Sequence, residues 1–240
     1  SSDVCSSDLL LSSFNSMIAI QTKMRDDLIE AEKLKQQLSL NLLQQQVNPH
    51  FLYNTLDNIC ALAELDEKET LIQLVMNLSS FYRSSLSNGK MHISIGQELE
   101  ISRAYLEILQ IRYFHKFDFT ITCPEALKNY SCIKLLLQPI LENSIYHGIK
   151  GLDRHGILHI EAEDAGDCIR FTISDNGRGF SKEDYEKIWQ QDADHFGIKS
   201  IQQRILLYYG PGYGLSMESP QTGGCITVIT LPKQEGLPCH

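Results

Sequence analysis

The sequence contains no long apolar run and no cluster of basic residues. None of its apolar stretches approaches the roughly 18 residues that a membrane-spanning helix needs, and no secretory signal is recognisable. Lys and Arg number 21 against 30 Asp and Glu, which gives a formal net charge of −9. We therefore expect neither nucleic acid nor an anionic membrane surface as the main partner, and we expect the fragment itself to be soluble and cytoplasmic.

A paired-cysteine motif is also absent. The seven cysteines are an odd number, they are widely spaced, and no two form a C-x-x-C pair. This pattern argues against a disulfide framework or a zinc site, and it favours a reducing compartment with inert or buried thiols. The cysteines are Cys5, Cys60, Cys123, Cys132, Cys168, Cys225 and Cys239.

The 240 residues are 42% hydrophobic and 21% charged, which is typical of one or two soluble domains. Residues 1–9 carry no structural pattern and look like a translated sequencing adapter, so we exclude them as an artefact and expect the natural chain to continue upstream. Residues 236–240 read as a short tail. The remaining chain divides into segments 10–42, 43–90 and 91–235.

Segment 10–42 has the spacing of a coiled coil. It lacks Gly and Pro, and Met17, Met24, Ala31 and Leu38 lie seven residues apart. A single surface helix is the alternative, but its apolar stripe would then lie uncovered. We therefore predict a signalling helix that pairs with a parallel partner.

A histidine stands on the polar face of the next predicted helix. His50, Asn54 and Asn58 follow one another at helical spacing, and apolar residues occupy another face. Pro49 directly precedes the histidine, although an interior proline costs a helix roughly 3 kcal/mol. A lone histidine of this kind is most often a surface residue. Whether His50 has a chemical role therefore depends on the motifs found downstream.

The helix of His50 and a second one ending near residues 87–89 predict a helical hairpin over 43–90. One hairpin buries too little apolar surface, so we expect two copies to form a four-helix bundle in a homodimer. Segment 91–235 mixes helices with alternating strands, and we predict an α/β sandwich with helices on one face of a mixed sheet. The fold class is thus α+β, with the domain boundary near residues 88–94.

Two stretches of the C-terminal segment carry candidate ligand-binding residues. Asp175, Gly177 and Gly179 follow an apolar strand, so a carboxylate meets two glycines that let the backbone approach a ligand. A plain turn is the alternative. Upstream, Asn143 on a predicted helix can offer its carbonyl oxygen to Mg²⁺. Its neighbour Glu142 is either a solvated carboxylate or a base near the metal, and the sequence leaves this open.

The string QVNPHFLYNTL around His50 resembles the phosphoacceptor box of sensor histidine kinases of the YesM/LytS type. Downstream, LQPILENSIYHG resembles the N box of the Bergerat (GHKL) ATP-binding fold, and DNGRG and HFGIKSIQQRI resemble its glycine boxes. The resemblance implies ATP as substrate, Mg²⁺ as cofactor, and Asp175 as the acceptor that selects adenine over guanine. It implies catalytic roles for His50, Asn54 and Glu142, a metal ligand in Asn143, and nucleotide contacts from Asn143, His147, Asp175, Gly177, Gly179, Gly197, Arg204 and Gly224.

The resemblance further implies autophosphorylation of His50 and transfer to an aspartate of a response-regulator receiver domain. The string LSSFNSMI resembles the end of a HAMP module, which implies that the full-length protein is held at the cell membrane by an upstream segment, with this part on the cytoplasmic side.

The second glycine box departs from the family pattern. His195 replaces a glycine, Ser200 replaces an asparagine, and Cys225 stands where the family has threonine. A nucleotide-binding pseudokinase or scaffold that signals by conformation is therefore the alternative function. An ATP-driven clamp of the gyrase or chaperone type ranks last, because Pro139 occupies the position of that class's glutamate.

Overall fold

The computed structural model describes residues 17–18, 20–26, 29, 49–86, 91–189, 196–221 and 223–235. Two compact units result, Ser1–Val47 and Asn48–His240. In the first, residues 17–18, 20–26 and 29 are helical, while most of the predicted coiled coil lies outside the described residues. Among the described residues, no helix is both long enough and apolar enough to cross a membrane.

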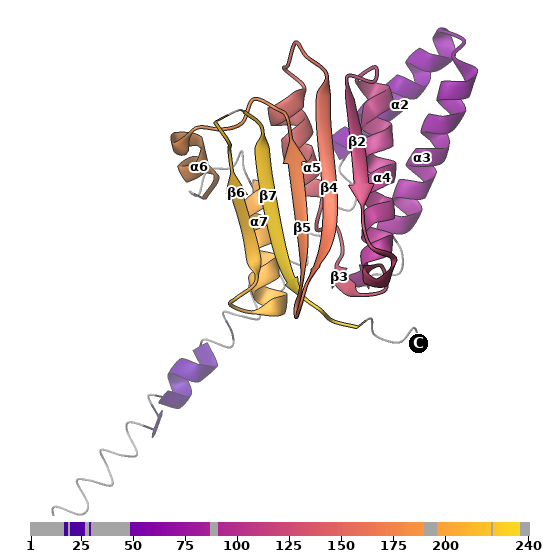
Figure 1. Cartoon of the computed structure of the whole chain (residues 1–240). Coiled ribbons are helices and arrows are strands. Elements are labelled where there is room, and N and C mark those ends of the chain that lie inside the picture. The colour runs from indigo at the N-terminus through magenta and orange to yellow at the C-terminus, as the bar shows by residue number, and fades with distance from the viewer. Residues whose placement is uncertain are drawn as a thin grey trace, which may run out of the picture. The chain divides into compact units, whose positions relative to one another are not determined.

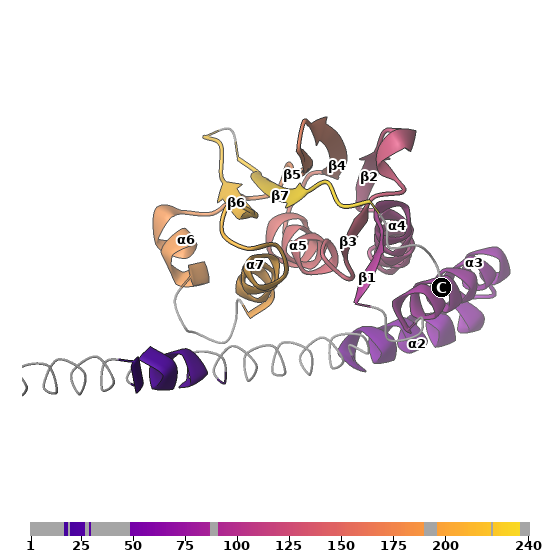
Figure 2. The same cartoon turned by 90° about the horizontal axis from the view of Figure 1, so that it is seen from below.

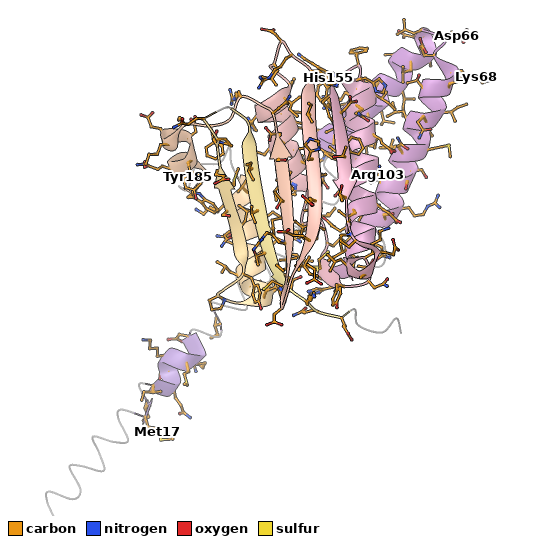
Figure 3. All side chains as sticks on the ribbon, in the orientation of Figure 1. Met17, Asp66, Lys68, Arg103, His155 and Tyr185 are labelled. Atoms are coloured by element: carbon orange, nitrogen blue, oxygen red, sulfur yellow. The ribbon has the colours of Figure 1, made fainter. Side chains whose placement is uncertain are left out.

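The second unit begins with a helical hairpin, as predicted. Helix α2 (Pro49–Glu64) and helix α3 (Lys68–Leu86) are joined by a turn in which Asp66 adopts a φ of 58°. Figure 3 labels Asp66 and Lys68 at this turn. The hairpin packs against helix α4 (Ile95–Arg112), which a capping box of Ser94 and Gln97 starts.

The sheet has the strand order β2-β4-β5-β7-β6. Strand β2 (Phe117–Thr122) pairs in parallel with β4 (Gly156–Ala165), and the other neighbours are antiparallel. These are β5 (Cys168–Asp175), β7 (Cys225–Pro232) and β6 (Gly214–Glu218). A small second sheet pairs β1 (His92–Ser94) with β3 (Ser131–Ile133), and a short 3-10 helix, η2 (Glu125–Leu127), precedes β3.

Helices cover one face of the large sheet, which confirms the predicted sandwich. Figure 2 shows α4, α5 (Gln138–Asn143) and α7 (Phe196–Tyr209) in one layer beside the strands, with α6 (Lys182–Trp189) near the β6 edge. Alternate strand residues face this layer and are buried, as the pattern of β4 and β7 shows. On α4, Arg103 (Figure 3) lies over the ring of Phe119 in β2, 5.9 Å from its centroid.

One predicted helix is shorter than expected. The sequence pattern predicts a helix over 133–149, but residues 131–133 form strand β3 and α5 begins only at Gln138. Between them, Leu135 adopts a φ of 54°, and the backbone bonds to buried side chains instead of to a helical turn. After α5 the chain continues as a π-helical turn, η3 (Ser144–Ile149), in which the Lys150 amide donates to the Ile145 carbonyl at 2.8 Å.

Candidate nucleotide site

A pocket lies where strand β5 ends and strand β7 begins. The register pairs Asp175 with Cys225, so the last residue of one strand stands beside the first residue of the other. Helix α5 and the π-helical turn η3 supply a second wall, and α6 contributes to the rim. The lining residues are Asn143, Ser144, His147, Gly148, Asp175, Arg178, Gly179, Phe180, Asp184 and Cys225.

Asp175 is a buried acceptor in this pocket, with 9% of its surface exposed. Its Oδ1 accepts hydrogen bonds from the amides of Gly177 at 2.9 Å and Cys225 at 3.2 Å. Burial raises the pKa of the Asp175 carboxyl, and hydrogen bonds from Ser144, Gly177 and Cys225 oppose that rise. A carboxylate in the wall of a pocket suits an amine donor on a ligand.

Two glycines allow the backbone to close around Asp175. A Cβ on Gly177 would lie 2.6 Å from the Asp175 Oδ1 and 2.7 Å from the Gly148 Cα, so no side chain fits there. Gly224 has a φ of 87°, and a Cβ on it would meet the Asp175 carbonyl. Neither glycine lines the pocket directly, and both shape the loop that does.

Helix α5 and the π-helical turn bring Asn143 and His147 into the pocket with Asp175. These residues are 32 and 28 positions before Asp175 in the chain, and their convergence was predicted from the sequence. The π-helical turn between them is a geometry that occurs often at functional sites. Asn143 is half-buried and His147 is exposed, so both side chains are accessible to a ligand.

Arg178 and Phe180 line the pocket but were not singled out from the sequence. Arg178 lies between Gly177 and Gly179, and its amide donates to the Gly148 carbonyl at 3.1 Å. Phe180 stacks on Tyr185 of α6, which Figure 3 labels, with ring centroids 5.9 Å apart. For Arg178 the available signal was its position between the two glycines, because a loop wrapped around a ligand exposes the residues between its glycines; Phe180 directly follows the second glycine.

Other predicted nucleotide contacts lie outside the pocket lining. Arg204 is only 1% exposed and donates to the carbonyls of Lys134 and Leu135. Gly197 lies against α5, where a Cβ on it would be 3.2 Å from the Pro139 Cβ. His195, which replaces a glycine of the second glycine box, lies outside the described residues.

Glu142 is not among the residues that line the pocket. Its Oε1 accepts from the Gln138 side-chain amide at 3.0 Å, and the side chain lies near Tyr105 of α4. Burial raises the pKa of Glu142, and the hydrogen bonds from Gln138 and Tyr105 oppose that rise. The carboxylate therefore joins α5 to α4 in this arrangement.

His50 is exposed on the first turn of α2. The next residue, Phe51, takes the buried face of the helix, with its ring 5.0 Å from Tyr105 and 5.3 Å from Phe81. Asn54 is half-buried one turn further on, and its Nδ2 has no hydrogen-bond partner among the described residues. The fold therefore directs the His50 imidazole to solvent while its neighbour anchors the helix.

Comparison with known families finds two matches in this chain. Residues 130–235 match the family described as histidine kinase-, DNA gyrase B- and HSP90-like ATPases, which is the class that the sandwich and its pocket define. Residues 38–117, which include His50, match the histidine kinase family.

Several characterised proteins align with most of this chain. Sensor histidine kinase YesM of Bacillus subtilis is 31% identical over 219 residues, covering 91% of this chain and 37% of that protein. Sensor histidine kinase BtsS of Escherichia coli is 33% identical, covering 75% and 31%, and sensor protein LytS of Staphylococcus haemolyticus is 28% identical, covering 81% and 34%. The chain belongs to the sensor histidine kinases of the YesM and LytS type, and it spans about a third of the length of these relatives.

Proposed function

We propose that this chain is the kinase part of a two-component sensor, which phosphorylates His50 from Mg²⁺-bound ATP and passes the phosphoryl group to a response-regulator aspartate. The observation that carries the proposal is the convergence of Asp175, Asn143 and His147 on one pocket. The exposure of His50 at the start of α2 provides an accessible acceptor.

ATP fits the groups that the pocket offers. The Asp175 carboxylate, which lines the pocket, can accept from the exocyclic amine of adenine, whereas the guanine carbonyl at the same place would be repelled. Asn143 would supply one oxygen to Mg²⁺, which prefers few protein ligands and keeps phosphate and water for the rest of its shell. His147 and Arg178 are donors that line the same pocket and are suited to phosphate.

The transfer itself needs orientation more than a strong base. A ring nitrogen of neutral His50 attacks the γ-phosphorus, the bond to ADP breaks, and the ring proton is released to water. Asn54, one turn along α2, is placed to hold the ring or touch the arriving phosphoryl group. We assign no proton transfer to Glu142, because it does not line the pocket and its Oε1 accepts from the Gln138 amide.

The assembly that performs this reaction is a homodimer. The hairpin exposes apolar side chains along α2 and α3, and two hairpins would cover them in a four-helix bundle. The receiver domain would dock on that bundle near His50. We further propose that the full-length protein resides at the cell membrane with this part on the cytoplasmic side, which the HAMP-like string LSSFNSMI supports.

A nucleotide-binding pseudokinase is the second candidate. Two observations favour it: a thiol, Cys225, lines the pocket where the family has a threonine, and Glu142 is not among the residues that line the pocket. Burial raises the pKa of Cys225 to about 11, so the group is an uncharged thiol at neutral pH. Such a protein would bind ATP and transmit its signal without transfer.

Incubation with γ-labelled ATP and Mg²⁺ separates the two candidates. We expect label that survives alkali and is lost in acid, as a phosphorylated imidazole requires, and we expect none in His50→Gln or Asn143→Ala. His159→Gln is the matched control, because His159 is an exposed histidine on β4 outside the pocket. ATP binding without label in the parent would favour the pseudokinase, and label that persists in His50→Gln would show that another residue accepts the phosphoryl group.

A further inference from the structure

The backbone between β3 and α5 is held by two buried charged side chains from other helices. Residues 134–137 form neither helix nor strand, and Leu135 within them adopts a φ of 54°, a region that side chains other than Gly rarely occupy. Leu135 is nevertheless 2% exposed, so its amide and carbonyl cannot rely on water. Both groups must find partners inside the protein.

Glu98 of α4 accepts the amides of this segment. Its Oε2 accepts from the Leu135 amide and its Oε1 from the Leu137 amide, each at 2.9 Å, and the residue itself is fully buried. One carboxylate thus binds two amides that a helix or a strand would otherwise have satisfied. The pairing explains why the chain does not enter a helix at Ile133.

Arg204 of α7 binds the carbonyls of the same segment. Its guanidinium donates to the Lys134 carbonyl and, at 3.2 Å, to the Leu135 carbonyl. A second contact from α7 lies close by, because the Ile133 amide donates to the Tyr209 hydroxyl at 2.9 Å. The planar fork of an arginine can reach two neighbouring carbonyls, which a lysine cannot do with the same geometry.

The two charges compensate each other in the interior. Burial raises the pKa of Glu98, and the amide hydrogen bonds and the charge of Arg204 oppose that rise. Burial lowers the pKa of Arg204 to about 10, so the guanidinium stays charged at neutral pH. The two charges influence each other through the interior, but each holds the segment through its own hydrogen bonds, Glu98 to the amides and Arg204 to the carbonyls.

The geometry that this pair fixes is that of the nucleotide site. The segment leads directly into α5, which ends at Asn143. Helix α7 contacts the same region at two places, through Arg204 on the segment and through Gly197 against Pro139 in the first turn of α5. Displacement of the segment would therefore move Asn143 relative to the beginning of α7.

We propose that Glu98 and Arg204 are positioning residues for the kinase reaction, which hold the approach to α5 so that Asn143 keeps its place in the nucleotide pocket. The inference rests on the proposed kinase function. It replaces the direct phosphate contact that the sequence resemblance implied for Arg204, because the guanidinium is buried and bound to the two carbonyls.

Arg204→Lys and Glu98→Gln test the inference in the full chain. Each keeps much of the shape of the side chain but removes one of its two hydrogen bonds to the segment. The matched controls are Arg170→Lys and Glu163→Gln, which make the same changes in an exposed ion pair at 2.8 Å. Each protein is assayed well below its melting temperature, with the folded fraction checked by circular dichroism.

We expect the two variants to bind Mg²⁺-free ADP as the parent does, within about threefold, because adenine recognition depends on Asp175. The rate of His50 labelling at saturating Mg²⁺-bound ATP should fall roughly tenfold to hundredfold, as misplaced reacting groups do. Mg²⁺ should also tighten ATP binding less than in the parent. The double variant should be no slower than the slower single variant, because both act on one segment.

Three results would overturn the inference. Parent-like rates in folded Arg204→Lys and Glu98→Gln, with only a lower melting temperature, would mean that the pair serves stability alone. A loss of Mg²⁺-free ADP binding in Arg204→Lys but not in Glu98→Gln would mean that Arg204 contacts the nucleotide. Rates of His50 labelling that fall equally in Arg170→Lys and Glu163→Gln would mean that the effect does not depend on Glu98 and Arg204 in particular.

Failure of the proposed function is distinguishable from these results. If the parent takes no label, the kinase proposal fails, and the effect of Mg²⁺ on ATP affinity still tests the pair. If Arg204→Lys does not fold, Glu98→Gln gives the same comparison.

Discussion

The sandwich of residues 91–235 and the hairpin of residues 49–86 bury their apolar side chains to different extents. In the sandwich, Phe171, Ile229 and Leu137 are 0% exposed, and the helices close the core over one face of the sheet (Figure 1). In the hairpin, large apolar side chains stay 42–70% exposed, namely Tyr53, Leu56, Leu65, Ile72, Val75, Met76 and Leu86. The core of the sandwich is closed within one copy of the chain, whereas the hairpin leaves an apolar surface that the proposed dimer would cover.

The same contrast holds for the functional residues. The nucleotide pocket assembles Asn143, His147 and Asp175 from three elements of one copy. His50 lies on the hairpin, and its surroundings depend on what covers the exposed faces of α2 and α3. In the proposed kinase, the residues that would bind ATP thus belong to the sandwich alone, whereas the acceptor His50 belongs to the hairpin, whose exposed faces a second copy would cover.

Truncation of one apolar side chain in each region should give the largest difference. Phe171→Ala is expected to lower the free energy of unfolding by about 3–5 kcal/mol, because it leaves a cavity in a closed core. Met76→Ala, at a side chain that is 62% exposed, should change it by less than about 0.5 kcal/mol in the monomer. Urea denaturation at low protein concentration measures both, and equal losses would contradict the contrast.

A substitution at the buried acceptor should weaken nucleotide binding without affecting the hairpin. Asp175→Asn keeps the shape but replaces a charged acceptor, and hydrogen bonds to charged groups contribute about 1.5–3 kcal/mol, so ATP affinity should fall roughly 10- to 100-fold. Asp118→Asn, at an exposed carboxylate on β2, is the control. Calorimetric titration provides the measurement, and unchanged affinity in Asp175→Asn would remove Asp175 from the adenine site.

Acidification should give a smaller and graded effect at the same residue. Burial raises the pKa of Asp175, so its carboxylate is protonated at a higher pH than an ordinary aspartate as the pH falls, and ATP affinity should decline with it. Stability moves the other way: a raised pKa in the folded state favours folding at low pH, and this contribution is lost as the pH rises through that pKa. The ATP affinity of Asp175→Asn, measured over the same pH range, should not show this decline at low pH.

Sequence patterns predicted the sandwich well because its strands alternate and its motifs follow strand or helix ends. Asp175 was placed correctly at the end of an apolar strand, and Asn143 and His147 were placed together by helical spacing. The course of residues 133–137 was not predicted, because the apolar pattern continues through them; Pro139, in the first turn of α5, was the available signal for a helix start near Gln138. The conformation of residues 133–137 depends on Glu98 and Arg204, which lie 37 and 69 positions away from Leu135 in the chain.

The hairpin shows a second limit of the sequence. Helical periodicity predicted α2 and α3, but it could not tell which apolar residues α4 covers and which remain exposed. Phe51 is buried against Tyr105 and Phe81, whereas Tyr53, two residues further, is 67% exposed. Only the packing of α4 against the hairpin separates these two aromatic residues.

Sedimentation equilibrium of the full chain tests the central claim most directly. The parent should form a dimer at micromolar concentration, and the double variant Ile72→Lys/Met76→Lys should dissociate at least about tenfold more readily, because each lysine would place a charge in an apolar interface. Two lysines at exposed sheet positions, Thr122→Lys/Ser216→Lys, should leave the dimer intact. ATP affinity should stay unchanged in both variants. A monomeric parent, or a dimer equally stable in Ile72→Lys/Met76→Lys, would contradict the claim that the hairpin is the incomplete half.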